Sequence, residues 1–142
     1  MTRVDFYVLK ASGAMARLQF ACRLAEKAYR LENTIHILTS DQHTAEQMDE
    51  LLWTYRDGSF VPHELTSRDD SQTESPITIG HNPEQGRSCD LLINLTAQIP
   101  ATCDAFPRVA EIVTSDDNAR QQSRKHYAQY RELGHTLETH KI

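Results

Sequence analysis

The sequence predicts an α/β fold, a three-layer α/β/α arrangement with a mostly parallel sheet that is Rossmann-like but has no nucleotide site. Strand-like segments alternate along the chain with segments of helical periodicity, an order typical of a parallel sheet with helices on both faces. Residues 90–96, "DLLINLT", are almost continuously apolar, as expected of a central strand covered on both faces. The chain has 142 residues and no internal repeat, so we expect a single domain over residues 1–142.

The first predicted elements are a strand and a long helix. Residues 4–9, "VDFYVL", alternate and contain β-branched and aromatic side chains, which favours a strand. Residues 14–32 change to a helical period and carry a broad apolar face, as a helix on a sheet requires. One stripe of this face contains Met15, Leu18, Cys22, Ala25 and Tyr29, and a second contains Phe20, Leu24 and Leu31.

The middle of the chain predicts two more strands and a helix. Residues 34–40, "TIHILTS", and 77–80, "ITIG", favour strands. Residues from 42 to 55 between them favour a helix, which either Ser40 or Asp41 can cap.

The C-terminal part predicts a short strand and a helix. Residues 110–114, "AEIVT", favour the strand, and residues 115–134 the helix. Ser115 is the expected N-cap and Gly134 stands where a C-cap belongs. The segment after Leu137 shows no pattern that indicates an element.

Composition excludes several classes of protein. No apolar run approaches the roughly 20 residues of a membrane span, and residue 4 already starts a strand without a signal sequence, so we expect a cytoplasmic protein. The net charge of −5 disfavours direct nucleic-acid binding, because phosphates would be repelled. Cys22, Cys89 and Cys103 are scattered and without CxxC spacing, so we expect buried, reduced thiols.

The motifs of common enzymes and cofactor sites are missing from the sequence. "KASGAMARL" after the first strand has one glycine where a dinucleotide site needs three, and no phosphate-binding GxxxxGK[ST] occurs. No HExxH or GxSxG occurs, and we expect the seven histidines to be surface or capping residues. We therefore predict no catalytic residues, no metal and no cofactor.

Two aromatic side chains stand outside the predicted core. Trp53 has Glu46, Asp49 and Glu50 as its helical neighbours, so it projects from the acidic face of its helix. Phe60 follows an Asp-Gly turn, and Pro62 limits "SFVP" to an edge or non-strand segment. Exposed aromatics of this kind dominate protein interfaces, although the loop could instead fold back and bury both rings.

The last predicted helix carries a basic strip with an aromatic residue inside it. Arg120, Arg124, Tyr127 and Arg131 recur at steps of four, three and four, so they share one face. Arginine guanidinium groups beside an aromatic ring can bind a carboxylate-rich peptide that ends in a bulky apolar residue. The alternative is an ordinary solvated helix surface.

Over nearly the whole chain, these segments in their order resemble the chi subunit family of bacterial DNA polymerase III. The segments are "FYVL", "LLWTYRDGSFVPHEL", "DLLINL" and "ARQQSRKHYAQYRELG". The resemblance implies a non-catalytic accessory protein of the clamp-loader assembly, with a Rossmann-like fold and no nucleotide chemistry. It also implies two partners: a psi subunit, which links to the clamp loader, and the acidic C-terminal tail of single-stranded DNA-binding protein, which ends in phenylalanine. We expect a monomer until these partners bind.

By position, the resemblance implies a tail-binding site at Val113, Arg120, Arg124 and Tyr127. Arg124 would hold the terminal carboxylate, while Val113 and Tyr127 would form an apolar slot for the phenylalanine ring. Arg120 stands where relatives can have lysine. Arg131 is added from helical spacing alone.

The resemblance also implies a second, partner-binding surface. Trp53 and Phe60, with Val61 and Pro62 of the same segment, match aromatic positions that engage psi or, alternatively, a repair helicase. Two other classes of function stay open: a small nucleotide- or flavin-binding α/β enzyme, and a single-stranded DNA binder that uses the basic strip for stacking.

Overall fold

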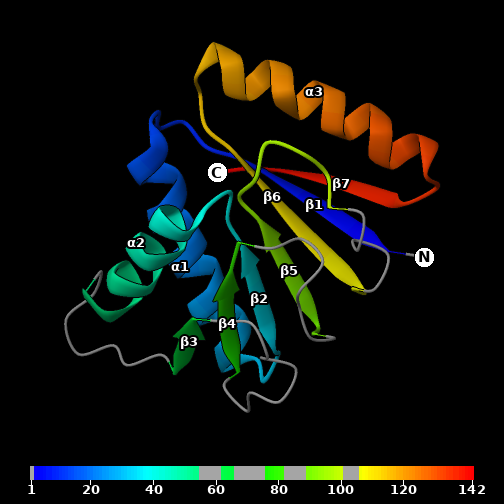
Figure 1. Cartoon of the computed structure of the whole chain (residues 1–142). Helices are drawn as coiled ribbons and strands as arrows, with labels where there is room; N and C mark the ends of the chain where they lie inside the picture. The colour runs from blue at the N-terminus through cyan, green and yellow to red at the C-terminus, as the bar shows by residue number, and fades with distance from the viewer. Residues whose placement is uncertain (1, 55–61, 66–75, 82–88, 101–105) are drawn as a thin grey trace.

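The computed structural model is a seven-stranded parallel sheet with helices on both faces (Figure 1). It describes residues 2–54, 62–65, 76–81, 89–100 and 106–142. The strand order is β3-β4-β2-β5-β6-β1-β7, and every strand pair in it is parallel. The predicted three-layer fold class is confirmed.

The structure contains every strand and helix that the sequence predicts, most of them with shorter ends, and two further strands. The helices are α1 (Ala14–Arg30), α2 (Gln42–Thr54) and α3 (Asp117–Glu132). The strands are β1 (Arg3–Val8), β2 (Ile35–Leu38), β3 (His63–Leu65), β4 (Ile77–Gly80), β5 (Leu91–Asn94), β6 (Arg108–Val113) and β7 (Thr136–Lys141).

The two faces of the sheet carry separate hydrophobic cores. Helices α1 and α2 cover one face, and α3 covers the other face above β6, β1 and β7 (Figure 1). Strand β5 lies at the centre of the sheet, with Leu91 and Ile93 in the first core and Leu92 in the second. The prediction of a central strand covered on both faces is therefore confirmed.

The two unpredicted strands are the edges of the sheet. Strand β3 starts directly after Pro62, which itself lies outside the strand, while residues 59–61 lie outside the described part of the chain. Strand β7 pairs with β1, and most of its side chains are exposed. An exposed edge strand needs no apolar alternation, so the sequence after Leu137 carries no strand signal.

Aspartate residues cap the N-terminal ends of α2 and α3. Asp41 rather than Ser40 caps α2, since its Oδ1 accepts a hydrogen bond of 2.7 Å from the Thr44 backbone N–H. The prediction of Ser115 as N-cap of α3 is wrong: Asp116 holds that position, and its carboxylate accepts hydrogen bonds from the Gly13 N–H and the Thr114 hydroxyl. These bonds tie the loop before α3 to the loop before α1.

The C-terminal end of α3 confirms the prediction for Gly134. Its φ of 85° is in the left-handed region, where glycine is favoured. The Gly134 N–H donates to the Arg131 carbonyl at 3.1 Å, and the His135 N–H donates to the Tyr130 carbonyl at 3.2 Å. These two bonds form a Schellman motif, which turns the chain directly into β7.

Predictions for the cysteines and histidines have mixed outcomes. Cys22 and Cys89 are buried and form no disulfide with each other, in agreement with the expectation of buried, reduced thiols, and Cys103 lies outside the described residues. The expectation of surface or capping histidines is wrong for His36, His63 and His126, which are all buried. Each of these rings has a polar partner in the structure, which explains why the interior tolerates it.

Candidate functional site

The basic strip, defined as Arg120, Arg124, Tyr127 and Arg131, lies on one flank of α3. All four side chains are exposed. Within the described part of the chain, none of the three guanidinium groups forms an ion pair or a hydrogen bond. A protein of net charge −5 therefore keeps three arginines on one face with their donors available.

The aromatic residue of the strip is held in place by the sheet. Tyr127 is 40% exposed, and its ring centroid lies 5.5 Å from that of Phe6 on β1. Phe6 is only 2% exposed and belongs to the core under α3, so Tyr127 rests on a fixed apolar base. A ring supported in this way presents one face to a ligand at little cost in conformational entropy.

Val113 contributes less surface than the sequence predicts. It ends β6 and is 5% exposed, while its register partner Val8 on β1 is only partly buried. Val8 therefore exposes more apolar surface at this end of the sheet than Val113 does. Sequence reasoning missed Phe6 and Val8 as site residues, although their alternation in the first strand placed both on one face.

The position of α3 is set by a buried polar network beneath it. The carboxylate of Glu111 on β6 lies 2.8 Å from His126 Nδ1, and it accepts hydrogen bonds from the Tyr130 hydroxyl at 2.9 Å and the Asn94 amide at 2.6 Å. His126 Nε2 lies 2.9 Å from the Ala97 carbonyl oxygen, which can only accept. Both ring nitrogens therefore lie within hydrogen-bond distance of oxygen atoms, an arrangement that favours the protonated imidazolium.

The pKa of His126 agrees with this assignment. The hydrogen bond to Glu111 raises the pKa of His126, against an opposing effect of burial and of the Arg17 charge. The network joins β5, β6 and α3, so it fixes the register of the helix and with it the direction of the basic strip.

Trp53 lies far from α3, near the end of α2. It is 49% exposed, and its ring centroid is 4.5 Å from that of His63 on β3. His63 Nε2 is in turn 3.0 Å from the Asp49 backbone oxygen and 3.2 Å from its carboxylate. Asp49 on the acidic face of α2 thus holds His63 in place, and Trp53 packs on the His63 ring. Pro62 is partly exposed, whereas Phe60 and Val61 lie outside the described residues.

The C-terminal edge of the sheet, where α/β proteins bind nucleotides, has a small cavity of about 170 Å³. Arg17 lines it together with the carboxylate residues Glu111 and Asp116. Ligand pockets are usually about 300–1,000 Å³, and two carboxylates would repel a phosphate. This cavity gives no support to the nucleotide- or flavin-binding alternative.

The described part of the chain shows neither a cluster of metal-ligating side chains nor a helix that could span a membrane. No group of three or more His, Cys, Asp or Glu side chains in this part of the chain could hold a metal ion. None of the helices that the structure describes is long and apolar enough to span a bilayer.

Comparison with known proteins identifies a family. Residues 1–138 match the family model described as DNA polymerase III chi subunit, HolC. The chain is 41% identical over 142 residues to the DNA polymerase III subunit chi of Pseudomonas aeruginosa, covering 100% of this chain and 98% of that protein. It is 34% identical to the subunit chi of Haemophilus influenzae, with 97% and 96% coverage, and 30% identical to that of Escherichia coli, with 98% and 97% coverage.

A solved structure shares the fold alone. The crystal structure of T4 UvsW matches with a TM-score of 0.64 at 9% identity, over 99% of this chain and 41% of that one.

Proposed function

Because the chain belongs to the DNA polymerase III chi subunit family, we propose that it works in DNA replication as an adapter with two binding surfaces. The surface on α3 captures the acidic C-terminal tail of single-stranded DNA-binding protein. The surface around Trp53 docks a psi subunit, which connects the adapter to the clamp loader. The adapter acts by binding and carries out no reaction of its own.

The single observation that carries this proposal is the basic strip. Three arginines, which have no partner among the residues that the structure describes, flank a half-exposed tyrosine that rests on the buried Phe6. An acidic peptide that ends in phenylalanine offers matching groups: carboxylates for the guanidinium forks, and a ring for Tyr127.

Each strip residue has a role in this proposal. Arg124 holds the terminal carboxylate, because it stands next to Tyr127 at a spacing of three residues on the helix face. Arg120 and Arg131 lie to either side and attract the acidic residues. The ring of the terminal phenylalanine packs against Tyr127 and the partly buried Val8, with Val113 beneath them.

The proposal of a second surface is supported by Trp53 and by the His63 ring on which it packs. A half-exposed tryptophan over a buried histidine is the kind of rigid aromatic that contributes most to protein interfaces. Pro62 directly precedes His63 and is partly exposed. In this proposal Phe60 and Val61 of the same segment contact the same partner, either psi or a repair helicase.

Function follows from the linkage of the two surfaces. When the adapter binds both partners, the clamp loader is tethered to the protein-coated DNA. The tether raises the effective concentration of the clamp loader at that DNA. The adapter needs no contact with DNA, and its net charge of −5 disfavours such contact.

The test is fluorescence anisotropy of a labelled acidic peptide that ends in phenylalanine. Arg124→Ala removes a charge-assisted contact, so the affinity should fall about thirtyfold, equivalent to about 2 kcal/mol. The same peptide without its phenylalanine should bind wild-type protein weakly. Lys27→Ala on α1 removes one positive charge far from the strip and should leave the affinity unchanged.

Three results would count against the proposal. An unchanged affinity of Arg124→Ala would show that the strip is not the site. Equal binding of the peptide without phenylalanine would show that its ring is not recognised. Failure of folded wild-type protein to bind would remove the tail-receptor role altogether.

A further inference from the structure

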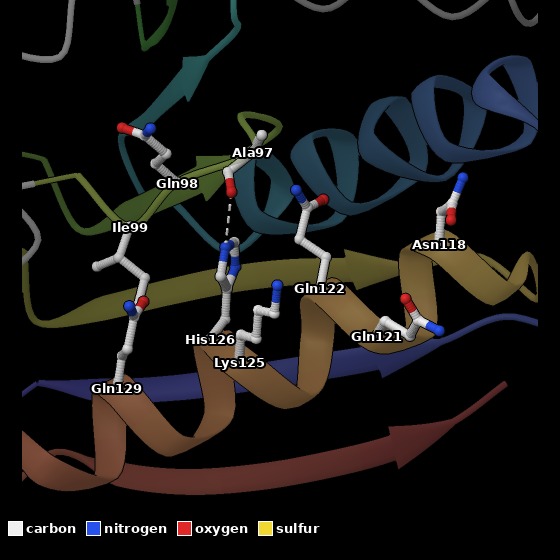
Figure 2. A pocket seen from close by; sticks show the side chains of 9 residues that line it. All are labelled: Ala97, Gln98, Ile99, Asn118, Gln121, Gln122, Lys125, His126 and Gln129. Carbon is white, nitrogen blue, oxygen red and sulfur yellow. Dashed lines mark hydrogen bonds between the residues drawn. The ribbon is translucent and has the colours of Figure 1, made fainter.

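A second binding feature lies on the opposite flank of α3 from the basic strip. It is a groove of about 610 Å³ between α3 and the loop that follows β5 (Figure 2). We call it the α3 groove. Its lining residues are Ala97, Gln98, Ile99, Asn118, Gln121, Gln122, Lys125, His126 and Gln129.

The lining of the α3 groove is dominated by side-chain amides. Five of the nine lining residues are glutamine or asparagine, and each amide offers two N–H donors. Within the described part of the chain, none of these amide side chains forms a hydrogen bond. The groove therefore presents amide donors and acceptors that have no partner among the described residues.

The charge of the α3 groove is positive. Lys125 lies on it without an ion-pair partner among the described residues. The imidazolium of His126 forms part of its inner wall, where Figure 2 shows the ring directed toward the Ala97 carbonyl. The carboxylate of Glu111, which neutralises His126, is buried behind it. None of the described residues that line the groove carries a negative charge, although the protein as a whole has a charge of −5.

This chemistry fits an extended acidic peptide. Carboxylate side chains accept hydrogen bonds from amide N–H groups and pair with the ammonium group of lysine, while side-chain amides also bond to a peptide backbone. A partner with an apolar surface would leave the amides of the groove without hydrogen bonds, which carries a desolvation penalty, and Lys125 would repel a basic surface.

The α3 groove and the basic strip are close enough for one peptide. Arg124, Gln121 and Lys125 follow one another around the exposed side of the helix, so a chain crossing α3 meets polar donors throughout. A helix with its side chains is about 10–12 Å wide, and an extended chain spans about 3.3 Å per residue. About four residues therefore separate a terminal residue on the strip from the segment that reaches the groove.

We propose that the α3 groove binds the acidic residues of the captured tail that lie about four or more positions before its terminal phenylalanine. This inference rests on the proposed function, since the strip must hold the end of the same tail. The groove would thereby distinguish a long acidic tail from any short peptide that ends in phenylalanine.

The experiment uses three labelled peptides and anisotropy titrations. The short peptide is Ala-Asp-Ala-Phe, and the long peptide adds Asp-Asp-Gly-Asp-Asp-Gly before it. A neutral long peptide has asparagine for each added aspartate. Wild-type protein should bind the long peptide about fivefold or more tightly than the short and the neutral ones, as expected for about one exposed ion pair.

Variants then test whether the higher affinity for the long peptide comes from the α3 groove. Lys125→Glu and Gln129→Glu should each abolish the preference for the long peptide while leaving affinity for the short one unchanged. Lys27→Glu and Gln19→Glu make the same charge changes on exposed positions of α1 and should keep the preference. These controls separate a local contact from a general effect of net charge.

The outcomes distinguish the two proposals. An unchanged preference in Lys125→Glu and Gln129→Glu would overturn the groove but leave the strip standing. Equal loss of preference in the α1 controls would also overturn it, because the gain would then come from overall charge. If wild-type protein bound none of the peptides, the proposed function itself would fail.

Discussion

Glu111 Oε1 on β6 lies 2.8 Å from His126 Nδ1 on α3, and both side chains are about 95% buried. This ion pair connects the sheet to the one helix that carries both the basic strip and the α3 groove. Because Glu111 also accepts from Tyr130 and Asn94, the carboxylate has three partners on two elements, α3 and β5. The direction in which the basic strip faces therefore depends on a buried contact beneath the helix.

Removing one partner of this pair should destabilise the protein strongly. His126→Ala leaves the buried Glu111 carboxylate without its counter-ion, so the free energy of unfolding should fall by about 3–5 kcal/mol. Urea denaturation followed by circular dichroism measures it. Arg120→Ala, on the exposed face of the same helix, should change stability by less than about 0.5 kcal/mol. A loss from His126→Ala no larger than that of Arg120→Ala would contradict the buried ion pair.

The same pair should make stability depend on pH. The folded pKa of His126 is raised, so its contribution is fully present below the unfolded value of about 6.5. That contribution is lost as the pH rises from there through the folded pKa. Wild-type protein should therefore lose stability over this range relative to His126→Gln, which cannot titrate. Parallel pH profiles of the two proteins would refute the assignment.

The edge strand β7 should be held to β1 by Asp5 and His140. Burial opposes ionisation of Asp5, yet hydrogen bonds from His140 and Arg108 outweigh it and lower the Asp5 pKa. This contribution is present above the unfolded value of about 3.8 and is lost as the pH falls through the lower folded pKa. His140→Ala should raise the Asp5 pKa and cost about 1 kcal/mol.

Nuclear magnetic resonance measures both effects of His140→Ala. The Asp5 carboxyl carbon reports the pKa, and hydrogen exchange of the β7 amides should become faster in the variant. His43→Ala, at an exposed position in α2, is the matched control. An Asp5 pKa that did not move would show that His140 does not hold the strand.

Trp53→Ala should separate the two proposed surfaces. Its ring packs on His63 and is half exposed, on a different part of the sheet from α3. We expect binding of psi to fall by more than tenfold, as for an interface hot spot, with the affinity for the acidic tail unchanged. Isothermal titration calorimetry with each partner checks this. Equal losses for both partners would mean that Trp53 is structural.

Cys22 should be inert toward thiol reagents in the folded protein. Burial raises its pKa to about 12, so almost no reactive thiolate forms at neutral pH. In a Cys103→Ser background, Cys22 and the likewise buried Cys89 should react with a disulfide reagent only after urea is added. Rapid reaction of a thiol without denaturant would show that one of the two sites opens easily.

Local sequence signals determined most of the fold. The continuous apolar run at β5 predicted a central strand, and the helical stripe predicted the buried face of α1, with Leu18, Cys22 and Ala25 confirmed. Exposed Met15 and Leu31 show where the stripe prediction for α1 extended too far. The sequence did not predict strand β7, because this strand forms by pairing with the edge of β1 after the turn at Gly134.

Residue spacing alone predicted the fold class, the exposure of Trp53 and the common helix face of Arg120, Arg124, Tyr127 and Arg131. Helical and strand periods are local properties of the chain, so they can be read from residue spacing. Packing in the folded protein was needed to show that Phe6 supports Tyr127, that His63 supports Trp53, and that His126 lies between the oxygen atoms of Glu111 and Ala97. These contacts join residues far apart in the sequence, and the burial and charge of each depend on which elements pack together.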